Sequence, residues 1–212
     1  MFILFTYFKK KTVGLSTLLP STLVLLTCFL AISANAQQKV EIDDQVNQHI
    51  FSYKEIECLE DPKGTLKFDQ ITSPEIASQF KESWSSTPQN YNQSSVYWYK
   101  ITIAHPLKTQ KNWMLEFFDQ TIDDITAYLP TGNGQYKVER LGALYQFGKR
   151  EIHHKNFGID LNLYHPGNYT YYFRIKSHQT ADVIIVLRSV NWFIEYALSE
   201  YLLFGVFYGM IL

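Results

Sequence analysis

The stretch Val96-Tyr-Trp-Tyr-Lys-Ile-Thr-Ile103 is rich in aromatic and β-branched residues, which are enriched in β-strands. Successive side chains of a strand point to opposite faces of its sheet. One face of this strand would therefore hold Tyr97, Tyr99, Ile101 and Ile103, and the other would hold Trp98, Lys100 and Thr102. The first face suits a core, whereas the second is aromatic and cationic.

A second stretch, residues 171–178, alternates in the same way. Its apolar face carries Tyr171, Phe173 and Ile175, and its opposite face carries Tyr172, Arg174, Lys176 and His178. The run Val183-Ile-Ile-Val-Leu187 is apolar on both faces, so we expect it to form a central strand.

Short apolar runs bounded by turn residues recur from His49 to Leu187, a spacing typical of an all-β sandwich or barrel. The runs predict strands at 49–54, 65–70, 95–104, 112–118, 123–130, 135–140, 156–163, 169–177 and 182–188. One short helix is expected at 73–80, with Ser73 as its cap and Pro74 at its first position. Residues 37–48 are polar without a clear period and are interpreted as a leader.

The composition excludes several classes of protein. The chain has 212 residues, 46% hydrophobic and 16% aromatic, which is enough for one packed domain or two small ones. With 19 basic and 20 acidic residues, the chain lacks the positive charge of a nucleic-acid binder.

The N-terminus has the pattern of a secretory signal peptide. Lys9, Lys10 and Lys11 precede an apolar stretch at 13–32, and Ala34-Asn-Ala36 fits a cleavage site. We therefore expect residues 1–36 to be a signal peptide; an uncleaved anchor helix is the alternative, and a lipoprotein site at Cys28 fits less well. Cys58 alone would remain after cleavage, so an internal disulfide is excluded and a structural zinc site is not expected.

The C-terminus is apolar. Residues 201–212 carry no charge, and aromatic residues precede them at Trp192, Phe193 and Tyr196, where a membrane-interface belt would lie. A membrane span needs about 20 apolar residues, so we expect 201–212 to be the start of a truncated transmembrane helix behind a juxtamembrane linker at 189–200. A buried helix end is the alternative.

Signals for catalysis are poor. Asp123-Asp124 and His153-His154 are adjacent pairs, and adjacent strand residues point to opposite faces, which prevents them from sharing a substrate or a metal. No phosphate-binding glycine loop, nucleophile elbow or metalloprotease helix is present in the sequence. We expect no enzymatic activity, no cofactor and no metal; a hydrolase with an unrecognised site is a remote alternative.

A ligand-binding surface is the better candidate. Aromatic side chains stack on sugar or ring faces, and cationic or imidazole groups orient a ligand by hydrogen bonds. The predicted ligand-binding residues are Trp98, Lys100, Arg150, His154, Arg174 and His178. In the alternative, Trp98 packs in the core and the cations pair with acids such as Glu116, Asp119 or Asp160.

The order of motifs resembles a known family. The first motifs in this order are Cys58-Leu-Glu-Asp61, Val96-Tyr-Trp-Tyr-Lys100 and Ile122-Asp-Asp-Ile125, the last with Tyr128. They are followed by Gly142 with Phe147 and Arg150, by Tyr172-Phe-Arg-Ile-Lys-Ser177 and by Phe204-Gly-Val-Phe-Tyr-Gly-Met210. This order, over roughly 50–212, resembles the periplasmic sensor domain of bacterial seven-transmembrane receptors with diverse intracellular signalling modules. The chain departs from the family at Lys100, where members often have arginine, whose planar fork binds carboxylates in a bidentate manner.

The resemblance implies a jelly-roll sensor domain at 49–188 that binds a small molecule, with carbohydrate as the candidate class. It further implies the inner membrane as the location, with the domain facing the periplasm and a contact to the membrane through the C-terminal helix. Further membrane helices and an output module, such as a histidine kinase or a nucleotide cyclase, would belong to the full receptor. A secreted carbohydrate-binding module is the alternative function.

Overall fold

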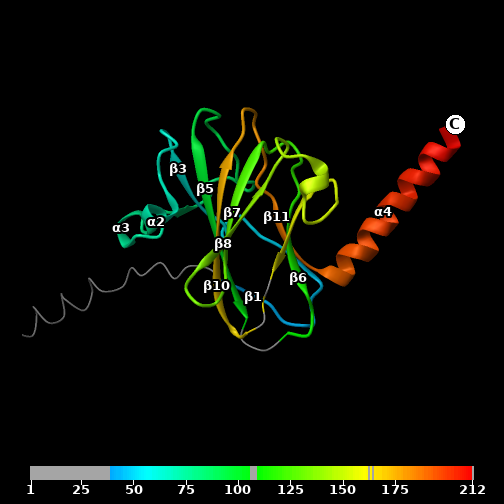
Figure 1. The fold of residues 1–212 in the computed structure, drawn as a ribbon, viewed down its shortest axis with the longest axis horizontal. Coiled ribbons are helices and arrows are strands. Elements are labelled where there is room, and N and C mark those ends of the chain that lie inside the picture. The colour runs from blue at the N-terminus through cyan, green and yellow to red at the C-terminus, as the bar shows by residue number, and fades with distance from the viewer. Residues whose placement is uncertain (1–38, 106–108, 162, 164, 212) are drawn as a thin grey trace, which may run out of the picture. The chain divides into compact units, whose positions relative to one another are not determined.

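The computed structural model describes residues 39–105, 109–161, 163 and 165–211. The predicted signal peptide lies outside these residues. Within them, seven strands form one sheet, sheet A, and four form a second, sheet B, and the two sheets face each other (Figure 1). The predicted all-β sandwich is confirmed.

Sheet A has the strand order β4-β3-β5-β10-β7-β8. Its members are β3 (Glu57–Asp61), β4 (Lys81–Glu82), β5 (Val96–His105), β7 (Asp124–Pro130), β8 (Tyr136–Leu141) and β10 (Gly167–Lys176). These strands pair antiparallel. The short β1 (Val40–Glu41) adds to β5 in parallel, so the segment predicted as a leader contains a strand.

Sheet B has the order β2-β11-β6-β9, all antiparallel. Its strands are β2 (Gln48–Ile50), β6 (Trp113–Phe117), β9 (Phe157–Leu161) and β11 (Ile185–Ser189). Apart from β1, β3 and β4, which extend sheet A, eight strands remain, in the spatial orders β2-β11-β6-β9 in sheet B and β5-β10-β7-β8 in sheet A. That distribution is the jelly-roll arrangement of two interlocked Greek keys.

The core between the sheets follows the predicted alternation. Tyr97, Tyr99, Ile101 and Ile103 of β5 all lie in it, as do Tyr171, Phe173 and Ile175 of β10. The strand expected to be central, β11, lies between β2 and β6, and all five of its residues are buried. Val40 and Ile42 of the predicted leader also pack into this core.

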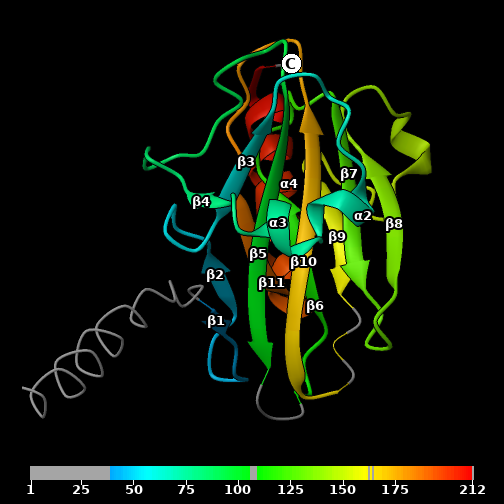
Figure 2. The same ribbon diagram turned by 90° about the vertical axis from the view of Figure 1, so that its left-hand side faces the viewer.

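Two short helices cover the outer face of sheet A in Figure 2: α2 (Phe68–Ile71) and α3 (Pro74–Ala77). α3 begins at Pro74 after Ser73, as predicted. The strand predicted at 65–70 is wrong, because residues 68–71 are helical. Its first turn is closed by the side chain of Gln70, which accepts a hydrogen bond from the Lys67 backbone N–H at 2.9 Å.

A 22-residue helix, α4 (Val190–Ile211), follows β11 without an intervening loop. Residues 190–200, expected to be a linker, are therefore helical and continuous with the apolar residues 201–211. Among the described residues, no helix combines the length and the apolar composition needed to cross a membrane.

Candidate functional site

Trp98 is not available to a ligand on the outer face of sheet A. Its indole is completely buried in a second apolar cluster with Ile71, Phe80, Val96 and Tyr172, beneath α2 and α3. The ring stacks on Tyr128 with a centroid separation of 5.6 Å. The alternative in which Trp98 is a packing residue is therefore the one that the structure supports.

Lys100 and Arg174 share this face with Trp98, as the alternation predicted, but both are paired. Lys100 is 8% exposed, and its ammonium lies 2.7 Å from Glu57 and 5.0 Å from the centre of the Phe80 ring. Arg174 approaches Asp124 at 3.7 Å and is half-buried. Both cations therefore have an acidic partner, which offsets the cost of removing their charges from water.

The other three predicted residues lie elsewhere. His178 is exposed, two residues after the end of β10, and pairs with Asp123. Arg150 and His154 lie after η2 (Phe147–Lys149), where the Arg150 guanidinium donates to the backbone carbonyls of His154 and Lys155 at 2.9 and 3.1 Å. The six residues therefore do not converge on one surface.

The members of each adjacent pair have different partners, although of the four residues only Asp124 lies in a strand. Asp123 accepts from the His178 backbone N–H at 2.8 Å, whereas Asp124 accepts from the Tyr145 hydroxyl at 2.8 Å. His154 is buried, whereas His153 is exposed and lies near Phe147. Within the described part of the chain, no group of three or more His, Cys, Asp or Glu side chains is placed to hold a metal ion.

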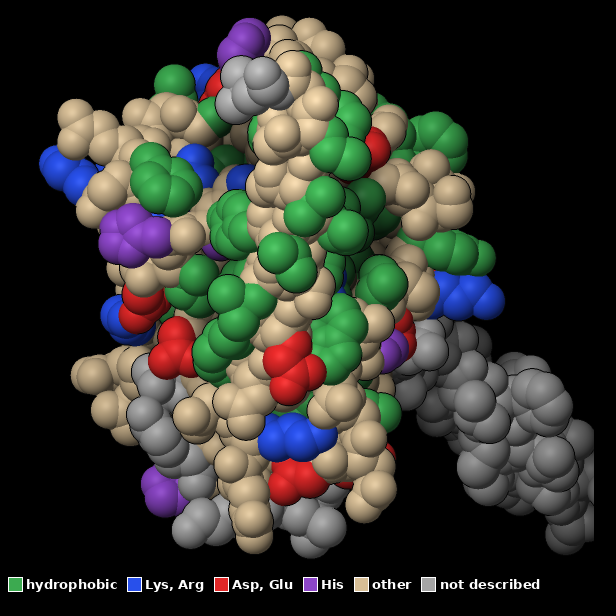
Figure 3. All heavy atoms as spheres, turned by 90° about the vertical axis from the view of Figure 1, so that its right-hand side faces the viewer, with side chains coloured by type: hydrophobic (Ala, Val, Ile, Leu, Met, Phe, Trp, Pro, Cys, Tyr) green, Lys and Arg blue, Asp and Glu red, His purple; other side chains and the backbone are tan. Residues whose placement is uncertain are grey.

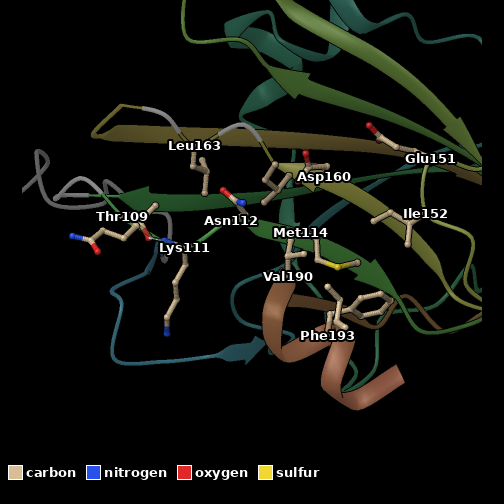
Figure 4. A pocket seen from close by; sticks show the side chains of 13 residues that line it. Thr109, Lys111, Asn112, Met114, Glu151, Ile152, Asp160, Leu163, Val190 and Phe193 are labelled. Atoms are coloured by element: carbon tan, nitrogen blue, oxygen red, sulfur yellow. Dashed lines mark hydrogen bonds between the residues drawn. The ribbon is translucent and has the colours of Figure 1, made fainter. Parts of the chain in front are cut away.

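A pocket of about 550 Å³ lies where α4 meets sheet B (Figure 4). Val190 and Phe193 of α4 lie beside Met114 of β6 in this view. The remaining walls come from the segment before β6, from the turn after η2 and from β9 and the residues after it. The lining residues are Thr109, Gln110, Lys111, Asn112, Met114, Glu151, Ile152, Asp160, Leu161, Leu163, Val190, Phe193 and Ile194.

The segment 109–112 is held firmly against the residues around β2. Asp44 accepts hydrogen bonds from the Thr109 hydroxyl and from the Gln110 backbone N–H, and the Lys111 ammonium donates to the Val46 carbonyl at 2.8 Å. The Lys111 charge is therefore directed away from the pocket (Figure 4). The polar rim is formed by the exposed Gln110, Asn112, Glu151 and Asp160.

Two details shape the wall opposite α4. A Cβ on Gly158 would lie 2.9 Å from Ile152 Cδ1 and 3.0 Å from Met114 Cε, so the glycine lets these two lining side chains rest on β9. Burial, followed by the nearby Glu139 carboxylate, raises the pKa of Glu151 above its usual value. Glu151 and Asp160 leave the rim acidic, which disfavours anionic ligands.

Residues 53–189 match the family described as 7TMR-DISM extracellular 2, a range that covers more than half of the chain. The chain belongs to this family. A search of curated proteins finds no match. The 7TMR-DISM extracellular 2 family consists of sensor domains of seven-transmembrane receptors, so the resemblance drawn from the order of motifs is confirmed.

The family range and the pocket overlap only in part. The 7TMR-DISM extracellular 2 match runs from before β3 to the last residue of β11, and it ends one residue before α4 begins. Val190, Phe193 and Ile194, which close the pocket, therefore lie outside the matched domain. The pocket joins the domain to the segment that follows it.

Sequence reasoning missed the pocket because four separate segments build it. None of the six predicted residues is among its described lining residues. The sequence feature that could have indicated the pocket is the polar run Thr109-Gln-Lys-Asn112 next to a strand. Nothing local in the sequence, however, places that run beside residues 190–194.

Proposed function

We propose that this chain is the sensor domain of a bacterial membrane receptor and that it binds a small, hydroxyl-rich molecule in the pocket between sheet B and α4. Carbohydrates are the candidate class. The observation that carries the proposal is that one wall of the pocket belongs to the sandwich and the other to α4. A ligand that fills the pocket would contact both.

The chemistry of the lining supports a neutral polyol. Ligand pockets commonly measure about 300–1,000 Å³ and combine apolar walls with a few polar groups. Here Met114, Ile152 and Phe193 supply apolar surface, and the amides of Gln110 and Asn112 offer both donors and acceptors. The acidic Asp160 can accept hydrogen bonds from hydroxyl groups. In this proposal the domain binds its ligand without chemical conversion.

The mechanism would be differential binding. A ligand shifts a conformational equilibrium only as far as its affinity differs between the two states. Because Val190, Phe193 and Ile194 lie on α4, the affinity of the pocket depends on where α4 sits. The ligand would favour the position of α4 that closes the pocket.

The same proposal places the apolar end of α4 at the membrane. Residues 201–211 are exposed and uncharged, and Figure 3 shows hydrophobic side chains gathered along the helix. An exposed apolar surface of this kind usually marks a binding partner or a lipid phase. We propose that this end is the start of a membrane helix at the inner membrane, with the sandwich on the periplasmic side and the predicted signal peptide directing export.

Binding is tested by calorimetric titration of a panel of neutral monosaccharides and disaccharides into the full chain in detergent. Phe193→Ala and Gln110→Ala should each weaken binding of any sugar that the wild type binds by roughly tenfold. Gln79→Ala, an exposed glutamine beyond α3, is the matched control and should leave affinity unchanged. Equal affinity in all four proteins would place the ligand elsewhere.

Membrane association is tested by detergent phase separation. The full chain should enter the detergent phase, and a chain ending at Tyr201 should stay in the aqueous phase. If both chains remain aqueous, the alternative of a secreted carbohydrate-binding module is the better interpretation.

A further inference from the structure

A buried ionic cluster joins the outer face of sheet B to α4. Glu116 of β6 is completely buried; one of its carboxylate oxygens accepts from the Arg188 guanidinium of β11 at 2.6 Å. The other oxygen accepts from the Asn156 side chain at 2.7 Å. This pair lies beneath α4 and is separate from the pocket residues.

α4 closes over the cluster by aromatic and ionic contacts. The Arg188 guanidinium lies over the rings of Trp192 and Tyr196, 4.7 and 4.8 Å from their centres. One turn further on, Glu200 forms an ion pair with Lys155. Removal of α4 would expose Arg188 and would separate Glu200 from Lys155.

His154 occupies the centre of this interface and is 2% exposed. Its Nδ1 lies 3.7 Å from Glu116 Oε1, and its Nε2 lies 3.7 Å from Glu200 Oε2. The imidazole also packs edge-on against Phe193 and Tyr201 of α4, with ring centroids 5.0 and 5.9 Å away. The ring therefore touches both the sandwich and the helix.

Hydrogen bonding assigns the neutral tautomer. The Asn156 backbone N–H donates to Nδ1 at 3.3 Å, so Nδ1 carries the lone pair and Nε2 carries the hydrogen. A second proton would have to bind at Nδ1, where it would displace this hydrogen bond.

Each carboxylate of the cluster already has a cationic partner when His154 is neutral. Glu116 is matched by Arg188, and Glu200 by Lys155. A protonated imidazole would therefore add an uncompensated positive charge to a buried site, which is unfavourable. The titratable and charged groups that face the ring are Glu116 from β6, Arg188 from β11, Arg150 and Lys155 from the loop after η2, and Tyr196, Glu200 and Tyr201 from α4.

We propose that protonation of His154 loosens the docking of α4 on sheet B, so that acid frees the helix from the sandwich. This response to acid depends only on the buried ionic cluster around His154 and does not require a ligand in the pocket. Burial lowers the pKa of His154 below its usual value, although Glu116 and Glu200 act in the opposite direction. The docked state therefore favours the neutral ring, and docking weakens as pH falls through the ordinary histidine pKa of about 6.5.

The test is amide hydrogen exchange of residues 193–203 in the full chain in detergent, at pH 7.5 and pH 5.5, after correction for intrinsic exchange rates. Wild type should lose up to about tenfold of its protection in this segment on acidification, the factor for one pH unit below the ordinary pKa. His154→Gln cannot be protonated and should show no such change. His178→Gln, which removes an exposed histidine away from α4, should respond like wild type.

The Lys155→Met variant gives a second test, in which acid should no longer weaken the docking of α4. Without the Lys155 ammonium, Glu200 lacks its cationic partner, and a proton on His154 would supply a positive charge 3.7 Å from the Glu200 carboxylate. Acidification should then leave protection unchanged or increase it. The proposal is overturned if wild type shows no loss of protection, if His154→Gln loses protection as wild type does, or if Lys155→Met loosens in acid to the same extent.

Discussion

Arg174 lies directly opposite Trp98 in the β5–β10 ladder, with both side chains on the outer face of sheet A. The indole is completely buried, whereas the guanidinium remains partly exposed beside Asp124. α2 and α3 cover Trp98 but leave Arg174 partly exposed. The consequence is that Trp98 should contribute to stability and not to recognition.

Trp98→Ala should therefore destabilise the fold by about 3–5 kcal/mol, the usual cost of truncating a buried aromatic residue. The melting temperature should fall by roughly 10 °C. Trp84→Ala is the matched control, because Trp84 is 79% exposed and its loss should cost less than about 0.5 kcal/mol. Thermal unfolding followed by circular dichroism compares the two; similar losses would contradict the assignment.

The buried pair of Glu116 and Arg188 predicts strong non-additivity. Glu116→Gln leaves the Arg188 charge buried without a counter-charge, which should cost about 3–5 kcal/mol. The double variant Glu116→Leu/Arg188→Met removes both charges and should recover most of that loss. Urea unfolding of Glu116→Leu, Arg188→Met and the double variant measures the coupling, and additive losses would show that the pair does not act as a unit.

Replacement of Glu151 by glutamine should increase the stability of the fold in a pH-dependent way. Its pKa is raised in the folded chain, so the folded state favours the protonated form and loses stability as pH rises through the raised pKa. Glu151→Gln should therefore raise the melting temperature slightly at pH 7. At pH 4, where the carboxyl is largely protonated in both states, the advantage should disappear. An advantage of equal size at both pH values would point to a cause other than ionisation.

Gly158 predicts a steric effect at the pocket wall. Gly158→Ala should cost about 1–3 kcal/mol, because the new methyl group meets Ile152 and Met114 at or below 3.0 Å. Adding Ile152→Ala should relieve part of this cost. Gly148→Ala serves as the control, since a Cβ at that position meets nothing within 4 Å. Chemical denaturation of Gly158→Ala, Ile152→Ala, the double variant and Gly148→Ala tests the expectation; full additivity in the double variant would contradict it.

The strand patterns at 96–103 and 171–178 were sufficient to predict the sandwich and the residues on each face, because alternation requires only the period of a strand. The patterns did not reveal that the second face of sheet A is also covered. Residues 65–70 have an apolar spacing that suits either a strand or a helix, so the helix over Trp98 was missed.

The pocket and the cluster around His154 could not be predicted for a different reason. Both depend on α4 packing back onto sheet B, a contact between residues that are far apart in sequence, such as Glu116 and the α4 residues that face His154. The uncharged end of the chain indicated an apolar segment, but not that its preceding turns would lie over buried charges.

The direct passage from β11 into α4 has a mechanical consequence. The backbone N–H groups of Ser189 and Val190 donate to Asn47 and Asn112 at 2.8 Å each, so the base of the helix is fixed on both sides. With 22 residues at about 1.5 Å rise, α4 is about 33 Å long. A rotation of about 5° at this fulcrum would move the far end by about 3 Å, which is half the pitch of a helix. Because no residue separates β11 from α4, a small rotation at the sandwich would be transmitted directly to the far end of the helix.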